Sequence, residues 1–268
     1  MFTTLLPYLA YLSVGAVVGV LAGLLGVGGG LIIVPMLGFC FARLGFRSDS
    51  SMHLALGTSL ASIAFTSVSS FLAHHRRGAV VWGAVRRIVP GILAGTFCGS
   101  FLASQLTTGW LKGFFSVFLV YVAVQMLLDK KPAPSRELPG TLGMSAAGGV
   151  IGLVSSLVGI GGGSLSVPFL IWCNLTGHRA IGTSAAIGFP IAIAGSVGYL
   201  VNGWHAPGLP PGAVGYVYLP ALACIVAASV LTAPLGVRLA HRLPVSRLKR
   251  IFAVLLIVVG AQMVRSLF

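Results

Sequence analysis

The sequence predicts an all-α polytopic membrane protein with about ten hydrophobic segments in two inverted five-segment repeats, in which Gly-rich helices are broken or re-entrant. Composition, an internal duplication and the distribution of basic residues carry this prediction. Hydrophobic residues make up 57% of the 268-residue chain and charged residues 7%, and the mean hydropathy is +1.02. Such a chain has too little polar surface to cover a water-soluble globule.

The internal duplication defines the organisation of the chain. Residues 22–37, AGLLGVGGGLIIVPML, align without gaps with residues 155–170, SSLVGIGGGSLSVPFL, at eight identical positions in sixteen. Downstream, Gly-Thr-Ser recurs at 57–59 and at 182–184. We therefore divide the chain into a first transmembrane repeat, 1–128, a linker, 129–140, and a second, inverted transmembrane repeat, 141–268.

Each repeat contains five apolar segments. Helices rise 1.5 Å per residue, so runs of roughly 20 residues can cross a hydrocarbon core of about 30 Å. The expected segments are 8–27, 31–45, 53–74, 84–106 and 110–128, then 141–160, 164–176, 180–201, 214–236 and 247–267. The second segment of each repeat is short, so full spans and re-entrant hairpins are both open alternatives.

The basic residues test the inversion. If each repeat counts as five crossings, 13 of the 17 Lys and Arg residues fall on one side of the membrane and four on the other. With four crossings per repeat the split is nine to eight. Because cytoplasmic loops carry the excess of Lys and Arg, we expect both termini outside and the 129–140 linker in the cytoplasm. The net charge of +14 then predicts a lipid bilayer, with no nucleic acid, as partner.

Each copy of the duplicated motif contains three consecutive glycines followed five positions later by Val-Pro. A glycine costs about 1 kcal/mol in a helix interior, and proline removes a backbone donor, so the helix should unwind here. A nucleotide loop does not fit, because neither the G-x-G-x-x-G spacing nor a following lysine is present. Discontinuous helices at matching places in two inverted halves indicate a transporter binding site, and the N–H groups at a helix start favour an anion.

The candidate substrate-binding residues are these glycines and the hydroxyl groups near them. They are Gly28, Gly29, Gly30, Thr58, Ser59, Gly161, Gly162, Gly163, Ser164, Thr183 and Ser184. Pro35, Pro168 and Pro190 are the expected structural hinges. The Thr-Ser pairs have an alternative role in ordinary interhelical hydrogen bonds.

The small residues upstream of the glycine triplets predict close helix contacts instead of chemistry, because they recur at every fourth position. They are Gly15, Gly19 and Gly23 in the first repeat, and Gly148, Gly152 and Ser156 in the second.

The three acidic residues, Asp49, Asp129 and Glu137, all lie outside the interiors of the expected spans. This argues against a metal or amine transporter and against carboxylate-coupled proton exchange. Sodium held by backbone carbonyls and protons on a histidine both stay open as the coupling ion. His53 lies at a helix entrance close to Thr58, and a coupling role for a histidine is the less favoured of the open alternatives.

We expect no enzyme, because the sequence offers no nucleophile–base pair and no metal constellation. Catalytic residues, metal ligands and cofactors are accordingly expected to be none. The oligomeric state is left open.

The paired motifs GLLGVGGGLIIVP and SLVGIGGGSLSVP, each followed by Gly-Thr-Ser, resemble the sulfite exporter TauE/SafE family, also called the toluene-sulfonate uptake permease family. The late segment RLPVSRLKRIFAVLLIVVGAQM adds to the resemblance, which covers nearly the whole chain. It implies a cell inner-membrane permease for sulfite, a sulfonate or a related sulfur-containing or organic anion. The expected function is thus a secondary transporter that works by alternating access. An anion channel and a non-transporting membrane scaffold are the alternatives.

Overall fold

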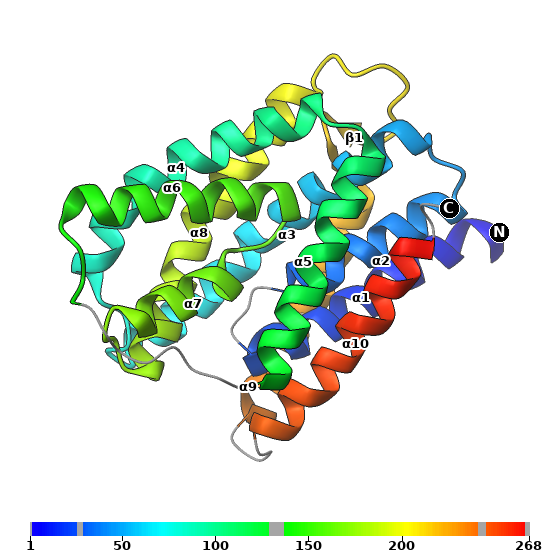
Figure 1. Cartoon of the computed structure of the whole chain (residues 1–268). Coiled ribbons are helices and arrows are strands. Elements are labelled where there is room, and N and C mark those ends of the chain that lie inside the picture. The colour runs from blue at the N-terminus through cyan, green and yellow to red at the C-terminus, as the bar shows by residue number, and fades with distance from the viewer. Residues whose placement is uncertain (1, 26–28, 129–136, 241–244, 266–268) are drawn as a thin grey trace.

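The computed structural model describes residues 2–25, 29–128, 137–240 and 245–265, which form ten helices and one short β-hairpin (Figure 1). The first half contains α1 (Phe2–Leu25), α2 (Gly30–Arg43), α3 (Ser48–Arg76), α4 (Trp82–Gln105) and α5 (Thr108–Leu128). The second half contains α6 (Thr141–Val158), α7 (Gly163–Trp172), α8 (Gly177–Gly203), β1 (Ala213–Val214), β2 (Val217–Tyr218), α9 (Leu219–Ala240) and α10 (Val245–Arg265). The predicted all-α polytopic fold is confirmed.

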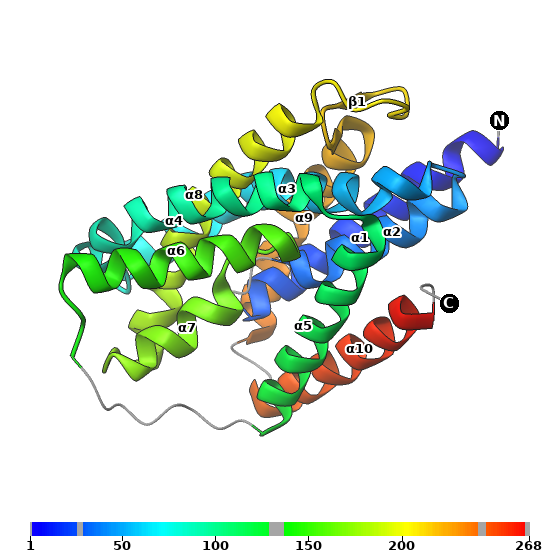
Figure 2. The same ribbon diagram turned by 45° about the horizontal axis from the view of Figure 1, so that its top comes forward.

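Consecutive helices alternate in direction, and the two termini lie toward the same end of the bundle (Figures 1 and 2). Among them, α2 has 14 residues and α7 has 10. At 1.5 Å per residue these lengths correspond to about 21 Å and about 15 Å, less than a hydrocarbon core of about 30 Å. Each therefore forms the short arm of a hairpin, α1–α2 or α6–α7, that dips into the bundle and returns, as the re-entrant alternative requires.

The first helix of each half packs in parallel against the fourth helix of the other half. A Cβ added to Gly15 of α1 would lie 2.8 Å from the Cα of Ile225, and one added to Gly19 would lie 2.7 Å from that of Ser229. Both contacts advance together along α1 and α9, so the two helices run in the same direction. Backbone approach this close requires glycine, and the predicted contact role of Gly15 and Gly19 is confirmed.

The α4–α6 pair repeats this arrangement. A Cβ on Gly91 would meet the backbone of Ser145, and one on Gly95 would lie 2.7 Å from the Cα of Gly149. From the α6 side, Gly148 and Gly152 face the backbone of α4, which confirms their predicted contact role. Ser156 packs with its Oγ against Gly99.

Two further pairs, α3 with α8 and α5 with α10, are equivalent helices of the two halves, and they run antiparallel. At the centre, Gly57 of α3 faces Tyr199 of α8, while Leu60 faces Gly195. At one edge, α5 and α10 lie side by side in opposite directions (Figures 1 and 2). Equivalent helices that pair antiparallel are related by an axis perpendicular to the helices, which is the geometry of inverted repeats.

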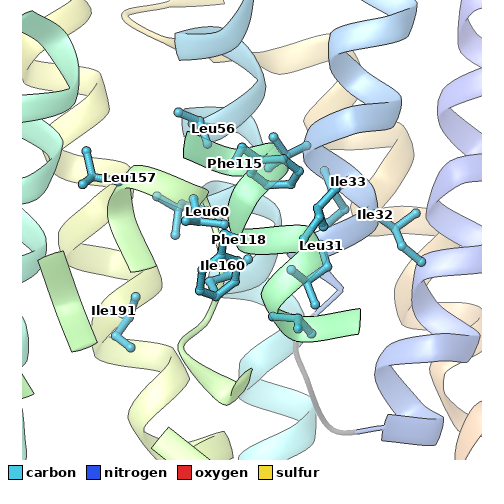
Figure 3. Packing of buried hydrophobic residues seen from close by; sticks show 14 of the residues in the cluster. Leu31, Ile32, Ile33, Leu56, Leu60, Phe115, Phe118, Leu157, Ile160 and Ile191 are labelled. Carbon is cyan, nitrogen blue, oxygen red and sulfur yellow. The ribbon is translucent and has the colours of Figure 1, made fainter. Parts of the chain in front are cut away.

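The apolar core joins the two halves around the tips of the hairpins. Figure 3 shows Leu31 of α2 near Phe118 and Ile160, with Leu56 and Leu60 of α3 beside them. Leu56 and Leu60 are fully buried. Lipid tails are as apolar as leucine, so this packing stabilises the bundle through van der Waals contact more than through removal of water.

One element differs from the sequence prediction. The sequence predicts a ninth helical segment from about residue 214, but α9 begins at Leu219. The preceding residues form the hairpin β1–β2, in which Ala213 pairs with Tyr218 and Val214 with Val217. Positive-φ glycines at 212 and 215 bend the chain here, and contacts with α3 described below hold the hairpin in place.

Candidate functional site

The turns of the two hairpins meet in the middle of the bundle. A Cβ on Gly30 would lie 2.5 Å from the carbonyl oxygen of Gly159 and 3.0 Å from the Cα of Ile160. Gly161 faces Gly188, close to the midpoint of α8, and Ser59, close to the midpoint of α3, donates a hydrogen bond to the Gly159 carbonyl at 2.8 Å. The two motifs that the sequence singled out are therefore neighbours, although 133 positions separate them.

Glycine is required in each turn for its backbone conformation. Gly29 precedes α2 with φ of 70°, and the equivalent Gly162 precedes α7 with φ of 75°. Gly159, at the end of α6, also has a positive φ of 69°. L-residues adopt this left-handed region only at a cost of roughly 1–2 kcal/mol. The predicted breaks in the helices thus fall at the glycine motifs; Gly28 lies outside the described residues.

Each break places a helix N-terminus at the centre of the bundle. The first backbone N–H groups of α2 and α7 have no partner one turn earlier in their own helix, and the helix dipole adds partial positive charge there. The Gly29 carbonyl accepts from the N–H groups of Ile32 and Ile33, and the Gly162 carbonyl accepts from those of Leu165 and Ser166. Gly30 and Leu31, like Gly163 and Ser164, precede these donors and begin their helices.

Two buried hydroxyl groups flank the N-terminus of α7. Ser164 is 8% exposed and Ser155 is fully buried, and neither Oγ has a hydrogen-bond partner. The Ser155 Oγ lies 3.4 Å from the position that a Cβ of Gly162 would occupy. Buried hydroxyl groups normally have a partner, and both of these are available to donate to a ligand or to water. Ala22 and Leu31 stand at the equivalent positions of the first half.

The Gly-Thr-Ser tripeptides hold the turns and the loops before α4 and α9. Gly57 lies against the Tyr216 carbonyl, and the Thr58 Oγ1 accepts from the Tyr218 N–H at 2.9 Å. In the other half Gly182 lies against the Ala79 carbonyl, and the Thr183 Oγ1 accepts from the Val81 N–H at 3.0 Å. Thr58 and Thr183 thus fasten a loop of one half to the central helix of the other.

Ser184 supports the second turn. Its Oγ lies 2.7 Å from that of Ser166, which donates to the Gly162 carbonyl at 2.9 Å. Ser59 and Ser184 therefore lie beside the turns, where Ser59 bonds to the Gly159 carbonyl and Ser184 bonds to Ser166 of α7. Their role in substrate binding stays a prediction.

The three prolines lie within continuous helices, Pro35 in α2, Pro168 in α7 and Pro190 in α8. Their role as hinges stays a prediction. The sequence prediction did not include Ser155 and Ser166, whose signal was the hydroxyl side chain at positions where the first copy has Ala22 and Ile33.

We expect Thr58→Val to lower the free energy of unfolding by about 1–3 kcal/mol, because the Tyr218 N–H loses its acceptor. Thr58→Ser keeps that acceptor and should stay close to the wild type. Thermal unfolding of the purified variants in detergent measures the difference. Equal midpoints for the valine and serine variants would contradict the assigned role.

These features define a polytopic helical membrane protein with two re-entrant hairpins that meet at its centre. The family model of the sulfite exporter TauE/SafE family matches residues 11–263, and the chain belongs to this family. It is a membrane transporter.

Curated relatives agree with this class. A "Probable membrane transporter protein" of Haemophilus influenzae is 41% identical over 254 residues, which cover 94% of this chain and 96% of the relative. "Probable membrane transporter protein YunE" of Bacillus subtilis is 28% identical over 78% of this chain and 85% of its own length. A probable membrane transporter protein of Methanocaldococcus jannaschii is 27% identical over 97% of this chain and 95% of its own. No solved structure matches the chain significantly.

Proposed function

We propose that the protein is a secondary transporter of a small oxyanion, which binds at the N-terminus of α7 between Ser155 and Ser164. The observation that carries the proposal is the pair of buried, unpartnered hydroxyl groups at that N-terminus. Both can donate to an anionic oxygen, and the first N–H groups of α7 add further donors.

The chemistry of this site favours an anion over a cation. Within the described residues, the acidic side chains are Asp49, at the start of α3, and Glu137, before α6, and both are exposed. A buried cation would need carboxylates or a ring of carbonyls, whereas hydroxyl and N–H donors with the positive end of a helix dipole suit an oxyanion. Weak binding without a buried lysine also allows release on the other side of the membrane. Sulfite and small sulfonates, which present three acceptor oxygens, fit this donor set and the description of the family.

The proposed mechanism is alternating access around the paired turns. The close α1–α9 and α4–α6 pairs each join the two halves through backbone contact, so each pair is expected to move as a unit. Rocking of one such pair against the other, about the central α3–α8 pair, would open one end while closing the other. The helix ends place nine basic residues at one end of the described bundle, namely Arg76, Arg77, Arg86, Arg87, Arg179, Arg238, Arg247, Lys249 and Arg250. Four lie at the other end, namely Arg43, Arg47, Lys112 and Arg265. The positive-inside rule then supports both termini outside and the 129–140 linker in the cytoplasm.

The test is a panel of sulfite, C2 sulfonates and carboxylates against purified protein, read by thermal shift and by counterflow in proteoliposomes. We expect at least one sulfur oxyanion to bind and exchange. Ser155→Ala and Ser164→Ala should each weaken its binding by about tenfold, since each loses one hydrogen bond to a charged group.

The matched control is Ser196→Ala, because the buried Ser196 Oγ donates only within α8, to the Ala192 carbonyl. It should bind like the wild type. Unchanged affinity in both site variants would sink the site assignment. Conductance without counterflow would instead favour the channel.

A further inference from the structure

His53 is a buried titratable side chain that the proposed anion site does not use. It is 4% exposed, and its Nε2 lies 3.0 Å from the Ala103 carbonyl of α4. That hydrogen bond requires a proton on Nε2, so Nδ1 is the unprotonated nitrogen of the neutral ring. Nδ1 is buried and has no hydrogen-bond partner. The ring can therefore accept one more proton, at Nδ1.

Two aromatic rings connect His53 to the hairpin that carries the proposed anion site. The His53 ring stacks on Tyr216 of the β1–β2 turn with centroids 5.0 Å apart, and Tyr216 contacts Tyr199 of α8 edge-on at 6.4 Å. The Tyr199 hydroxyl donates to the Ser156 carbonyl of α6 at 2.9 Å, one residue from Ser155. The β1–β2 turn, His53 and helix α6 of the α6–α7 hairpin thus form one contiguous set of contacts.

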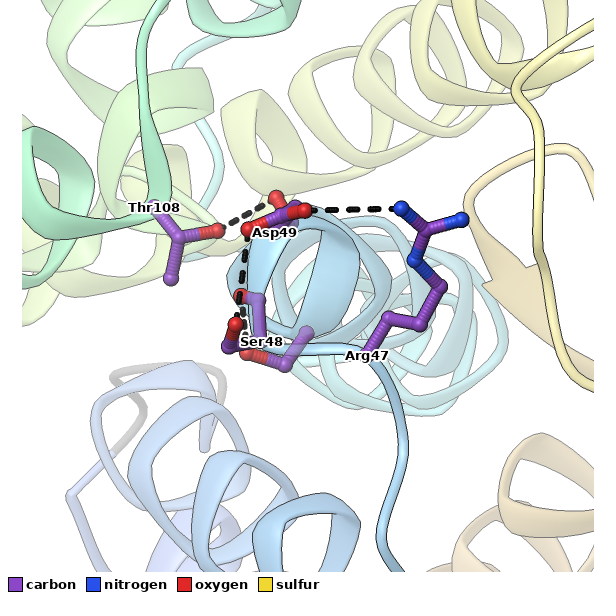
Figure 4. Close-up of polar contacts among 5 residues, drawn as sticks. Arg47, Ser48, Asp49 and Thr108 are labelled. Atoms are coloured by element: carbon purple, nitrogen blue, oxygen red, sulfur yellow. Dashed lines mark hydrogen bonds and ion pairs between the residues drawn. The ribbon is translucent and has the colours of Figure 1, made fainter.

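Among the titratable groups around His53, only His53 itself is placed to change charge at this position. Asp49, one turn earlier on α3, points its carboxylate away into an exposed pair with Arg47 at 3.7 Å, while its carbonyl accepts from Thr108 of α5 (Figure 4). From α4 the contact is the Ala103 carbonyl. From the β1–β2 turn it is Tyr216, whose pKa is raised by burial, so the phenol stays neutral.

We propose that His53 is the proton-binding residue of an outer gate formed by 213–218, and that the proton is the ion coupled to anion transport. This inference rests on the proposed function. A proton on Nδ1 creates a buried cation while Tyr216 covers the ring. Release of the β1–β2 hairpin lets water reach the His53 ring, so protonation of His53 favours the released state. By reciprocity, opening of the outer end favours proton uptake, and a monoanion and a proton then enter together without net charge.

Two amide hydrogen bonds report the docked hairpin directly. The Tyr216 N–H donates to the Tyr199 carbonyl at 3.2 Å, and the Tyr218 N–H donates to the Thr58 Oγ1 at 2.9 Å. Hydrogen exchange of these amides, corrected for the intrinsic effect of pH, should be roughly tenfold faster at about pH 5.5 than at about pH 7.5 in the wild type.

His53→Gln should remove this pH dependence, because the glutamine amide can still donate to the Ala103 carbonyl but does not titrate. His205→Gln is the matched control, since His205 lies exposed in the α8–β1 loop, and it should behave like the wild type. If His53→Gln misfolds, His53→Asn takes its place. Equal corrected exchange at both pH values in the wild type, or an unchanged pH effect in the His53 variant, overturns the proposal.

A flux experiment separates this inference from the proposed function. Uptake of the anion found in the panel should rise with an acidic exterior in the wild type and lose that response in His53→Gln. The exchange experiment uses no substrate, so failure to transport any anion would sink the proposed function and leave the exchange result standing. If His53→Gln transports the anion with the same dependence on external pH as the wild type, only the role of His53 is overturned.

Discussion

Alanine at Gly162 is expected to lower anion affinity and flux by more than tenfold in protein that remains folded. Gly162 has φ of 75°, where an L-residue costs roughly 1–2 kcal/mol. Its new Cβ would also meet the Cδ1 of Ile191. Because Gly162 sets the first turn of α7, relief of this strain shifts the N–H groups and Ser164 that we propose to bind the anion. Equilibrium binding and counterflow measure the loss.

Two further variants separate the causes of this effect. Gly177→Ala, at the start of α8, has open space around the added Cβ and should be neutral. Ile191→Val removes the Cδ1 atom, so Gly162→Ala/Ile191→Val should recover the steric part of the loss and leave the part that comes from the backbone conformation. Wild-type flux in Gly162→Ala would refute the functional importance of the turn.

Leucine at Gly95 is expected to prevent assembly of the bundle. A Cβ at this position would lie 2.7 Å from both the Cα and the carbonyl carbon of Gly149, so the obstacle is backbone, which cannot rotate away. Overpacking normally costs about 1–3 kcal/mol, and a forced separation of α4 from α6 should exceed that range. Size-exclusion chromatography after detergent extraction should show loss of the monodisperse peak.

Gly83→Leu in the same helix is the control for this experiment. The position has no neighbour within 4 Å of an added Cβ, so the variant should elute like the wild type. A monodisperse, thermally stable Gly95→Leu protein would contradict the close α4–α6 contact.

Local sequence features predicted the elements that depend on local chemistry. The breaks before α2 and α7 follow from glycine triplets that no helix tolerates well, and the structure places them at Gly29 and Gly162. The contact role of Gly15, Gly19, Gly148 and Gly152 follows from spacing alone, because side chains four apart share a helix face. The short second segment of each half indicated the hairpins, but parity could not distinguish a hairpin from two crossings.

The partners of the polar residues could not be predicted, because they are far apart in the sequence. The sequence indicates Thr58 and Ser59 as candidates for anion binding or interhelical hydrogen bonds, but nothing local indicates that Thr58 binds Tyr218 or that Ser59 binds Gly159. The β1–β2 hairpin could not be predicted for the same reason, because its short strands are fixed by contacts with the distant helix α3. The sequence indicates only that His53 lies near the start of a helix, whereas in the structure α4 and Tyr216 cover its ring.

The exchange of first and fourth helices between the halves has a consequence for biosynthesis. The contact of Gly15 with Ile225 joins residues 210 positions apart, so α1 leaves the ribosome long before its main partner exists. At a synthesis rate of about 5–20 residues per second, α1 waits on the order of 10–40 s in the membrane with its glycine face uncovered. Each half is therefore an incomplete folding unit, and insertion factors that shield small-residue helix faces during synthesis would be needed most by the first half.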